Sequence, residues 1–165
     1  MASEVVGRKA WPILGHSART ALAAVASLLA ARLFQLPETY WAPITTIVIT
    51  QSSLGAALAV SWQRFVGTAF GAAVGALVAS HFGPHALVFG AGVFALGLLC
   101  AVTNADRSAY RFGGVALAIV LLVPRTRSPW QIAFDRFAEV SIGIGVALIL
   151  AVVWPEKEAN QQGKT

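Results

Sequence analysis

Arg64 is the residue of this sequence best suited to bind an anion. It opens an apolar stretch, and Thr68 follows four positions later, on the same side of a helix. The planar guanidinium of an arginine can hold a carboxylate through two parallel hydrogen bonds, and the threonine hydroxyl adds a donor one turn away. The alternative is that Arg64 reaches the lipid headgroups and only anchors its helix. The sequence leaves both interpretations open.

Arg136 and Glu139 form a second charged group, three positions apart in another apolar stretch. This spacing lets them pair on one helical face, which lowers the cost of burying either charge. The pair could gate anions, or Glu139 could accept a proton in exchange for substrate. The alternative is a structural ion pair that locks two helices together.

Other polar side chains occur within apolar stretches. Thr46, Thr50 and Ser53 recur along one segment with Gln51 beside them. Hydroxyls can bond their own helix, whereas Gln51 is costlier to bury and is expected to face a cavity. Arg32 is explained by its reaching the membrane interface, with a pore role as the alternative. The predicted substrate path comprises Arg64, Thr68, Gln51, Thr50, Arg136, Glu139 and Arg32.

No catalytic constellation is apparent, so the sequence predicts neither an enzyme nor a cofactor. His81 and His85 are four positions apart, but Gly83 and Pro84 interrupt any helix that would align them for a metal. Cys100, the one cysteine, has no basic residue near it in the sequence that would activate a thiolate. Phosphate loops and serine-centred nucleophile elbows are also missing from the sequence.

A glycine stripe follows Arg64, with Gly67, Gly71 and Gly75 recurring every fourth residue. In water each glycine would cost a helix about 1 kcal/mol relative to alanine. In lipid the backbone must satisfy its own hydrogen bonds, so the helix forms and the stripe becomes a face for close packing. Gly143 is expected to pack in the same way in the last apolar stretch.

Composition favours a membrane protein. Apolar residues make up 57% of the chain and charged residues 12%, about half the share usual in soluble proteins. The net charge is +5, but the basic residues gather at segment ends, which suits membrane topology better than nucleic-acid binding. The bias of lysine and arginine predicts that both termini are cytoplasmic.

Apolar segments alternate with short polar breaks, which predicts an all-α, polytopic membrane helix bundle with six transmembrane helices. The fifth segment is short for the roughly 20 residues that a span requires, so five spans are the alternative. The module is expected at 18–155, between polar cytoplasmic tails at 1–17 and 156–165. The six predicted spans are about 20–36, 41–60, 65–82, 86–103, 112–123 and 128–154.

A shift of 72 positions superposes Arg64-Phe65 on Arg136-Phe137, and Gly71 on Gly143. Three spans separate the two copies, so they would run in opposite directions. Inverted repeats of three plus three helices build many transporters, with the substrate site near the repeat interface. Such matches could also arise by chance in apolar sequence.

These motifs together resemble the fusaric acid resistance, or aromatic acid exporter, family. The family pattern has a Tyr-Trp pair opening the second helix and R-x-x-G-T-x-x-G opening the third. The matching residues here are Tyr40-Trp41-Ala42-Pro43-Ile44-Thr45-Thr46, Gln51-Ser52, Arg64 to Gly71, Arg136 to Glu139, Gly143 and Trp154-Pro155.

The resemblance implies a six-helix module in a bacterial inner membrane that passes organic anions, with aromatic or small carboxylates as the class. Plant aluminium-activated malate channels are distantly similar. Longer members carry two modules, so a homodimer is expected here, with Arg64 at the inner mouth and Arg136 and Glu139 at the outer gate. The alternative is a non-transporting membrane scaffold or accessory subunit of a larger exporter.

Overall fold

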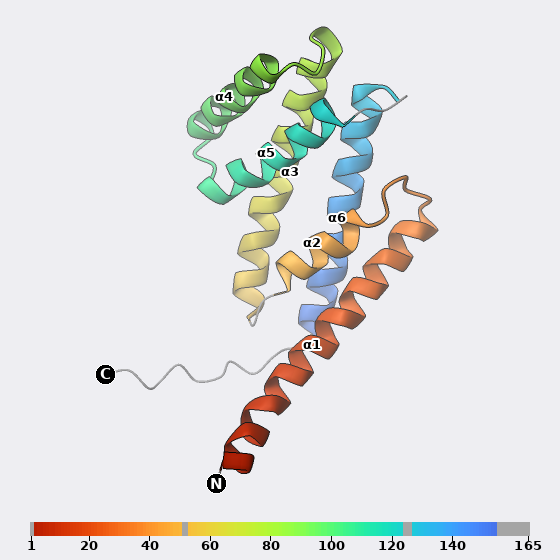
Figure 1. Cartoon of the computed structure of the whole chain (residues 1–165), viewed down its shortest axis with the longest axis vertical. Helices are drawn as coiled ribbons and strands as arrows, with labels where there is room; N and C mark the ends of the chain where they lie inside the picture. The colour runs from red at the N-terminus through yellow and green to blue at the C-terminus, as the bar shows by residue number, and fades with distance from the viewer. Residues whose placement is uncertain (1, 51–52, 124–126, 155–165) are drawn as a thin grey trace, which may run out of the picture.

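The computed structural model describes residues 2–50, 53–123 and 127–154, with side chains from residue 13 onward, and this part of the chain is entirely helical. α3 and α6 form the centre, and they run in opposite directions in Figure 1, where α1 and α4 lie on opposite sides of them. The six helices are α1 (Ala2–Leu33), α2 (Trp41–Ile49), α3 (Leu54–His81), α4 (Ala86–Val102), α5 (Arg107–Leu122) and α6 (Pro129–Val153).

The expected second span at 41–60 is wrong, because the helix breaks within it. α2 has nine residues and rises about 13 Å, well short of the roughly 30 Å of a bilayer core. Thr50 leaves the helix in an extended conformation, and Ser53 caps the next helix by accepting a hydrogen bond from the Ala56 N–H at 3.3 Å. A serine at this position favours a helix start over helix continuation. α3 therefore begins at Leu54, earlier than predicted, and has 28 residues.

The other boundaries also differ from the expected spans. The segment at 2–17, expected as a polar tail, is the first half of α1. α5 has 16 residues and is short, as the sequence predicts for the fifth element, although it begins at Arg107. By length and hydropathy, Ile13–Leu33 and Pro129–Val153 are candidate membrane spans, and Ala86–Val102 is a shorter apolar helix. Six helices are present in the described residues, but not six helices of clear spanning character.

The glycine stripe of α3 packs against the backbone of α5. A Cβ added at Gly67 would overlap the carbonyl oxygen of Ala109, and one at Gly71 would overlap that of Gly113. Gly75 lies farther along, against Leu117 and the side chain of Val120. Contacts that advance together along both helices show that α3 and α5 run parallel, with the glycines permitting a backbone-to-backbone approach.

Gly143 provides the corresponding contact between α6 and α2. A Cβ at Gly143 would lie 2.5 Å from the Ala42 carbonyl oxygen and 2.7 Å from Cβ of Thr45. The Thr46 hydroxyl lies 3.0 Å from each of the Ala42 and Gly143 carbonyl oxygens, to which it can donate. Each short helix thus packs on the long central helix of the other half.

This exchange of short helices supports the inverted repeat. Gly71 and Gly143, which are 72 positions apart, contact Gly113 and Ala42, which are 71 positions apart. Phe65 and Phe137, also 72 positions apart, contact each other with ring centroids 4.9 Å apart. Equivalent residues contact each other where a two-fold axis passes between them, so these rings mark the pseudo-symmetry axis.

The distribution of side chains is that of a protein surrounded by lipid. Leu87 is 89% exposed, and Phe94 and Phe134 are each 70% exposed. Between the helices, by contrast, lie small residues together with buried Arg64, Arg136 and Glu139. Large apolar side chains outside and charges inside suit a helix bundle in hydrocarbon, where polar groups turn toward the bundle interior.

Candidate functional site

Arg64 lies in the interior of α3, as its eleventh residue, and is 7% exposed. Its Nε donates a hydrogen bond of 3.2 Å to Oγ1 of Thr45 on α2. Its guanidinium carbon lies 4.9 Å from the ring centroid of Phe112 on α5, which is a cation–π contact. The expectation that Arg64 marks the mouth of a helix is wrong, because α3 starts at Leu54.

Arg136 and Glu139 form the ion pair that their spacing predicts. They are 3% and 1% exposed, and Nη1 of Arg136 lies 3.3 Å from Oε2 of Glu139. The Arg136 guanidinium lies 3.5 Å from the centroid of the Trp41 ring. The backbone N–H of Glu38 donates to the other oxygen of the Glu139 carboxylate at 3.0 Å. Trp41 Nε1 donates in turn to Glu38 Oε2 at 3.0 Å.

The two arginines contact adjacent turns of the same short helix. Arg136 contacts Trp41 and Arg64 contacts Thr45, and these α2 residues are four positions apart on one helical face. Arg64 and Arg136 therefore belong to one cluster, which corrects their expected placement at opposite mouths. The carboxylate of Glu139 pairs with Arg136, and that of half-buried Glu38 accepts a hydrogen bond from Trp41, whose ring lies against the Arg136 guanidinium.

The remaining residues of the predicted path are dispersed. Thr68 is buried on α3, one turn after Arg64. Thr50 is half-buried, and its hydroxyl donates to the Thr46 carbonyl at 2.7 Å. Arg32 is exposed in the last turn of α1, in contrast to the buried charges of the cluster. Gln51 lies outside the described residues.

Sequence reasoning missed the partners that hold the two guanidinium groups. Trp41 was noted only as part of the Tyr-Trp pair that opens the second helix, and Phe112 only as the start of an apolar segment. Local sequence patterns do not predict these cation–π contacts, because each ring and its arginine lie on helices that are far apart in the sequence. Arg19 is a further buried cation that the sequence patterns did not single out, at 2% exposed.

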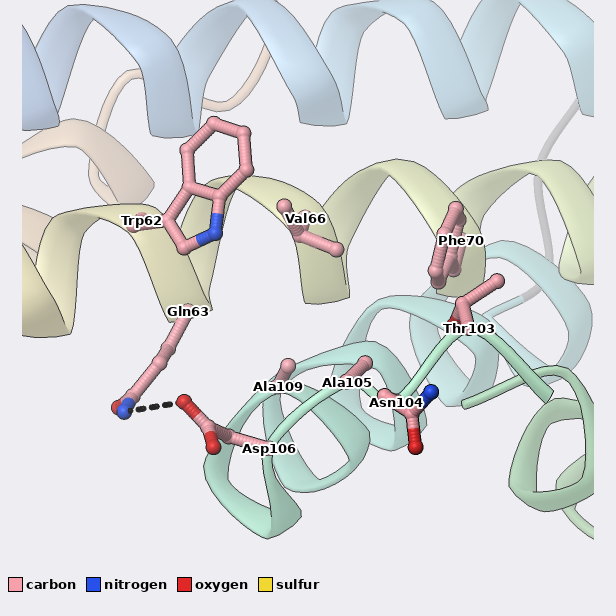
Figure 2. Close-up of a pocket in the computed structure, with 9 residues that line it drawn as sticks. All are labelled: Trp62, Gln63, Val66, Phe70, Thr103, Asn104, Ala105, Asp106 and Ala109. Carbon is pink, nitrogen blue, oxygen red and sulfur yellow. Dashed lines mark hydrogen bonds between the residues drawn. The ribbon is translucent and has the colours of Figure 1, made fainter. Parts of the chain in front are cut away.

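A pocket of about 320 Å³ lies between α3 and the turn that connects α4 to α5, and its lining contains neither of the two arginines of this cluster. Figure 2 shows Trp62, Val66 and Phe70 projecting from α3 on one side, with the turn residues opposite. Gln63 Nε2 donates to Asp106 Oδ2 at 3.0 Å, as the dashed line shows. Asp106 is the charged residue of the lining, so this pocket is less suited to an anion than the arginine cluster.

Comparison with known proteins gives the family. A family model described as fusaric acid resistance protein-like matches residues 22–150. Inner membrane protein YeeA of Escherichia coli (strain K12) is 30% identical over 150 residues, which cover 86% of this chain and 41% of that protein. The chain thus spans about two fifths of the length of this relative. No solved structure matches the chain. The matched region includes the C-terminal part of α1, all of α2 to α5 and most of α6, and the chain belongs to the fusaric acid resistance protein-like family.

Proposed function

We propose that this chain is a subunit of an inner-membrane transporter or channel that moves organic anions, with aromatic or small carboxylates as substrates. The observation that carries the proposal is Arg64, which is 7% exposed and is paired with a hydroxyl rather than a carboxylate among the described residues. A buried guanidinium without a counter-charge is costly, and it binds an anion strongly where water is excluded.

Two further observations support this assignment. The family connects the chain with fusaric acid resistance, and fusaric acid is an aromatic carboxylate. The relative YeeA is named as an inner membrane protein, and the exposed apolar surface of this chain suits the same environment. In this proposal Thr68, Gln51 and Thr50 add polar groups along the path, while Arg32 attracts anions at the end of α1.

The pair of Arg136 and Glu139 supplies a means of coupling. A proton taken up by Glu139 would remove the carboxylate charge next to Arg136 and change the electrostatic field at Arg64. Anion movement would then respond to a proton gradient. Without a proton gradient, the same cluster would pass anions down their own gradient.

A flux measurement in proteoliposomes tests the proposal, with hydroxybenzoate, fusarate, malate and chloride compared at equal concentration. We expect the wild-type chain to pass carboxylates selectively and Arg64→Gln to lose this flux. Arg111→Gln is the matched control, because Arg111 is exposed on α5 and its Nη2 donates to Ser108 Oγ. Carboxylate flux in Arg64→Gln equal to that of wild type would refute the role of Arg64.

An accessory membrane subunit is the second candidate, and a groove between α3 and α6 favours it. Trp130, Phe134 and Phe137 form its walls, over a floor of small alanines that includes Ala69 and Ala73. A helix of a larger exporter could pack on such a floor, since small residues let helices approach closely. Folded protein that passes no anion alone, but co-purifies with a larger membrane partner, would select this candidate over transport.

A further inference from the structure

The pocket between α3 and the α4–α5 turn lies outside the proposed anion path, since no residue of that path is among its described lining residues. Its α3 wall includes Trp62, Val66 and Phe70, which recur every fourth position and therefore lie on one face of the helix. The opposite wall combines small and polar residues of the turn and of the start of α5, namely Thr103, Asn104, Ala105, Asp106 and Ala109. The pocket thus combines an aromatic wall with a polar one.

Asp106 gives this pocket a negative charge. Its Oδ2 accepts a hydrogen bond of 3.0 Å from Nε2 of Gln63, whose side chain is neutral. Within the described part of the chain Asp106 forms no ion pair, whereas Asp135, the other aspartate of the sequence, is paired with Arg127. The next residue, Arg107, is exposed and is not among the described lining residues. The carboxylate therefore has a neutral partner at the pocket and no cationic one among these residues.

The side chain of Asp106 serves the pocket rather than its own helix. Asp106 is the N-cap residue of α5, a position where aspartate usually accepts a hydrogen bond from a backbone N–H of the first turn. Here the side chain makes no capping bond, and it reaches Gln63 on α3 instead (Figure 2). The turn before it contains Asn104 with a φ of 51°, in the left-handed region that asparagine adopts more readily than most residues. The turn therefore presents the carboxylate to α3 across the pocket.

We propose that this pocket binds an organic cation, an ammonium group attached to an apolar or aromatic body. The ammonium group pairs with the Asp106 carboxylate, and the side-chain amide of Asn104 offers a further acceptor oxygen. The body of the ligand lies along the α3 wall, where the faces of the Trp62 and Phe70 rings attract a cation. A ligand of this charge does not follow from the proposed anion path, so the inference goes beyond the proposed function.

Two sources can supply this group, a free amine or the ethanolamine headgroup of a lipid. The volume of about 320 Å³ is near the lower end of the range for small-molecule sites, so it accepts a small amine or one end of a larger molecule. Trp62 is 67% exposed, so the aromatic wall continues onto the outer surface of the bundle, where a lipid can reach it. The ammonium chemistry is the same in both cases.

Titration calorimetry of the purified full chain in an uncharged detergent tests the inference, with phenethylammonium as the probe. We expect saturable binding, with an affinity at least about tenfold weaker for phenylethyl alcohol and for phenylpropionate, which carry a neutral and an anionic group instead. Asp106→Asn should weaken phenethylammonium binding by a similar factor, because the amide can still accept the bond from Gln63 but has no charge. Asp135→Asn is the matched control and should bind as the wild type does. Trp62→Leu, at an exposed position, should weaken binding severalfold and covers the possibility that Asp106→Asn does not fold.

Competition with short-chain lipids identifies the source of the ammonium group. Displacement of phenethylammonium by phosphatidylethanolamine, but not by phosphatidylglycerol of the same chain length, assigns the site to a lipid headgroup. Displacement by neither lipid assigns it to a free amine. The inference is overturned if phosphatidylglycerol displaces the probe as well as phosphatidylethanolamine does, or if phenylethyl alcohol or phenylpropionate binds as tightly as the probe. Wild-type affinity in both Asp106→Asn and Trp62→Leu, or no binding of phenethylammonium to the wild type, also overturns it.

Discussion

At the scale of single residues, the bond between Arg64 and Thr45 joins α3 to α2 through one hydroxyl. Thr45→Val keeps the shape of the side chain and removes the acceptor of the Arg64 Nε, 3.2 Å away. Leaving a buried donor unpaired costs about 1–3 kcal/mol, so we expect the unfolding free energy in mixed micelles to fall by that amount. Thr103→Val is the control, because Thr103 is exposed and its hydroxyl bonds the carbonyl of Leu99. An equal loss in both variants would contradict the buried bond.

The ion pair of Arg136 and Glu139 allows a second prediction at this scale. Glu139→Gln leaves the Arg136 guanidinium buried without its carboxylate, which typically costs about 3–5 kcal/mol of unfolding free energy. Replacing both residues together, by methionine and leucine, should restore most of that loss, because no charge then stays buried. Asp135→Asn is the matched control, since its partner Arg127 is exposed and such pairs contribute about 0–1 kcal/mol. If the double variant were as unstable as Glu139→Gln, the buried charge of Arg136 would not be the cause of the lost stability.

The same pair also bears on energy coupling. Glutamine cannot exchange a proton at neutral pH, so Glu139→Gln should remove any dependence of anion flux on a transmembrane pH gradient. The measurement is carboxylate flux in proteoliposomes with and without that gradient, using protein whose folding has been checked by size exclusion. Asp135→Asn, one turn away and near the surface, should keep the dependence of the wild type. A gradient effect that survives in Glu139→Gln would exclude this residue from coupling.

At the scale of elements, the close approach of α3 and α5 depends on Gly71. An added Cβ there would overlap the carbonyl oxygen of Gly113, so Gly71→Val must force the two helices apart. We expect a loss of at least about 2 kcal/mol of unfolding free energy, the size associated with severe overpacking. Gly145→Ala is the control, because the space around Gly145 is open, and it should be neutral or stabilising by up to about 1 kcal/mol. Similar stability of Gly71→Val and Gly145→Ala would contradict a tight contact.

The helices also show which features of the fold could be predicted from the sequence and why other features could not. The regular spacing of Gly67, Gly71 and Gly75 indicates a packing face, since the period of a helix is a local property. The break between α2 and α3 was missed because the apolar segment continues through it and Ser53 is equally acceptable as a buried hydroxyl. Because of that error, Arg64 was predicted to lie at a helix mouth. The ion pair of Arg136 and Glu139 could be predicted, because the two residues are only three positions apart in the sequence. The contact of Arg64 with Phe112 depends on packing between distant helices, and local patterns do not specify it.

At the scale of the whole molecule, the expected homodimer would bring together two copies of this six-helix unit in lipid, and each copy would contribute one arginine cluster. Native mass spectrometry from nanodiscs should show a species of twice the chain mass of 17.3 kDa. The ratio of protein to nanodiscs should be low enough that two unassociated copies rarely enter the same disc. A tagged copy should also recover an untagged copy co-expressed with it, while copies mixed after purification serve as the control for exchange. A chain that is monomeric in both measurements, and yet passes carboxylates, would place the complete anion path within one six-helix module.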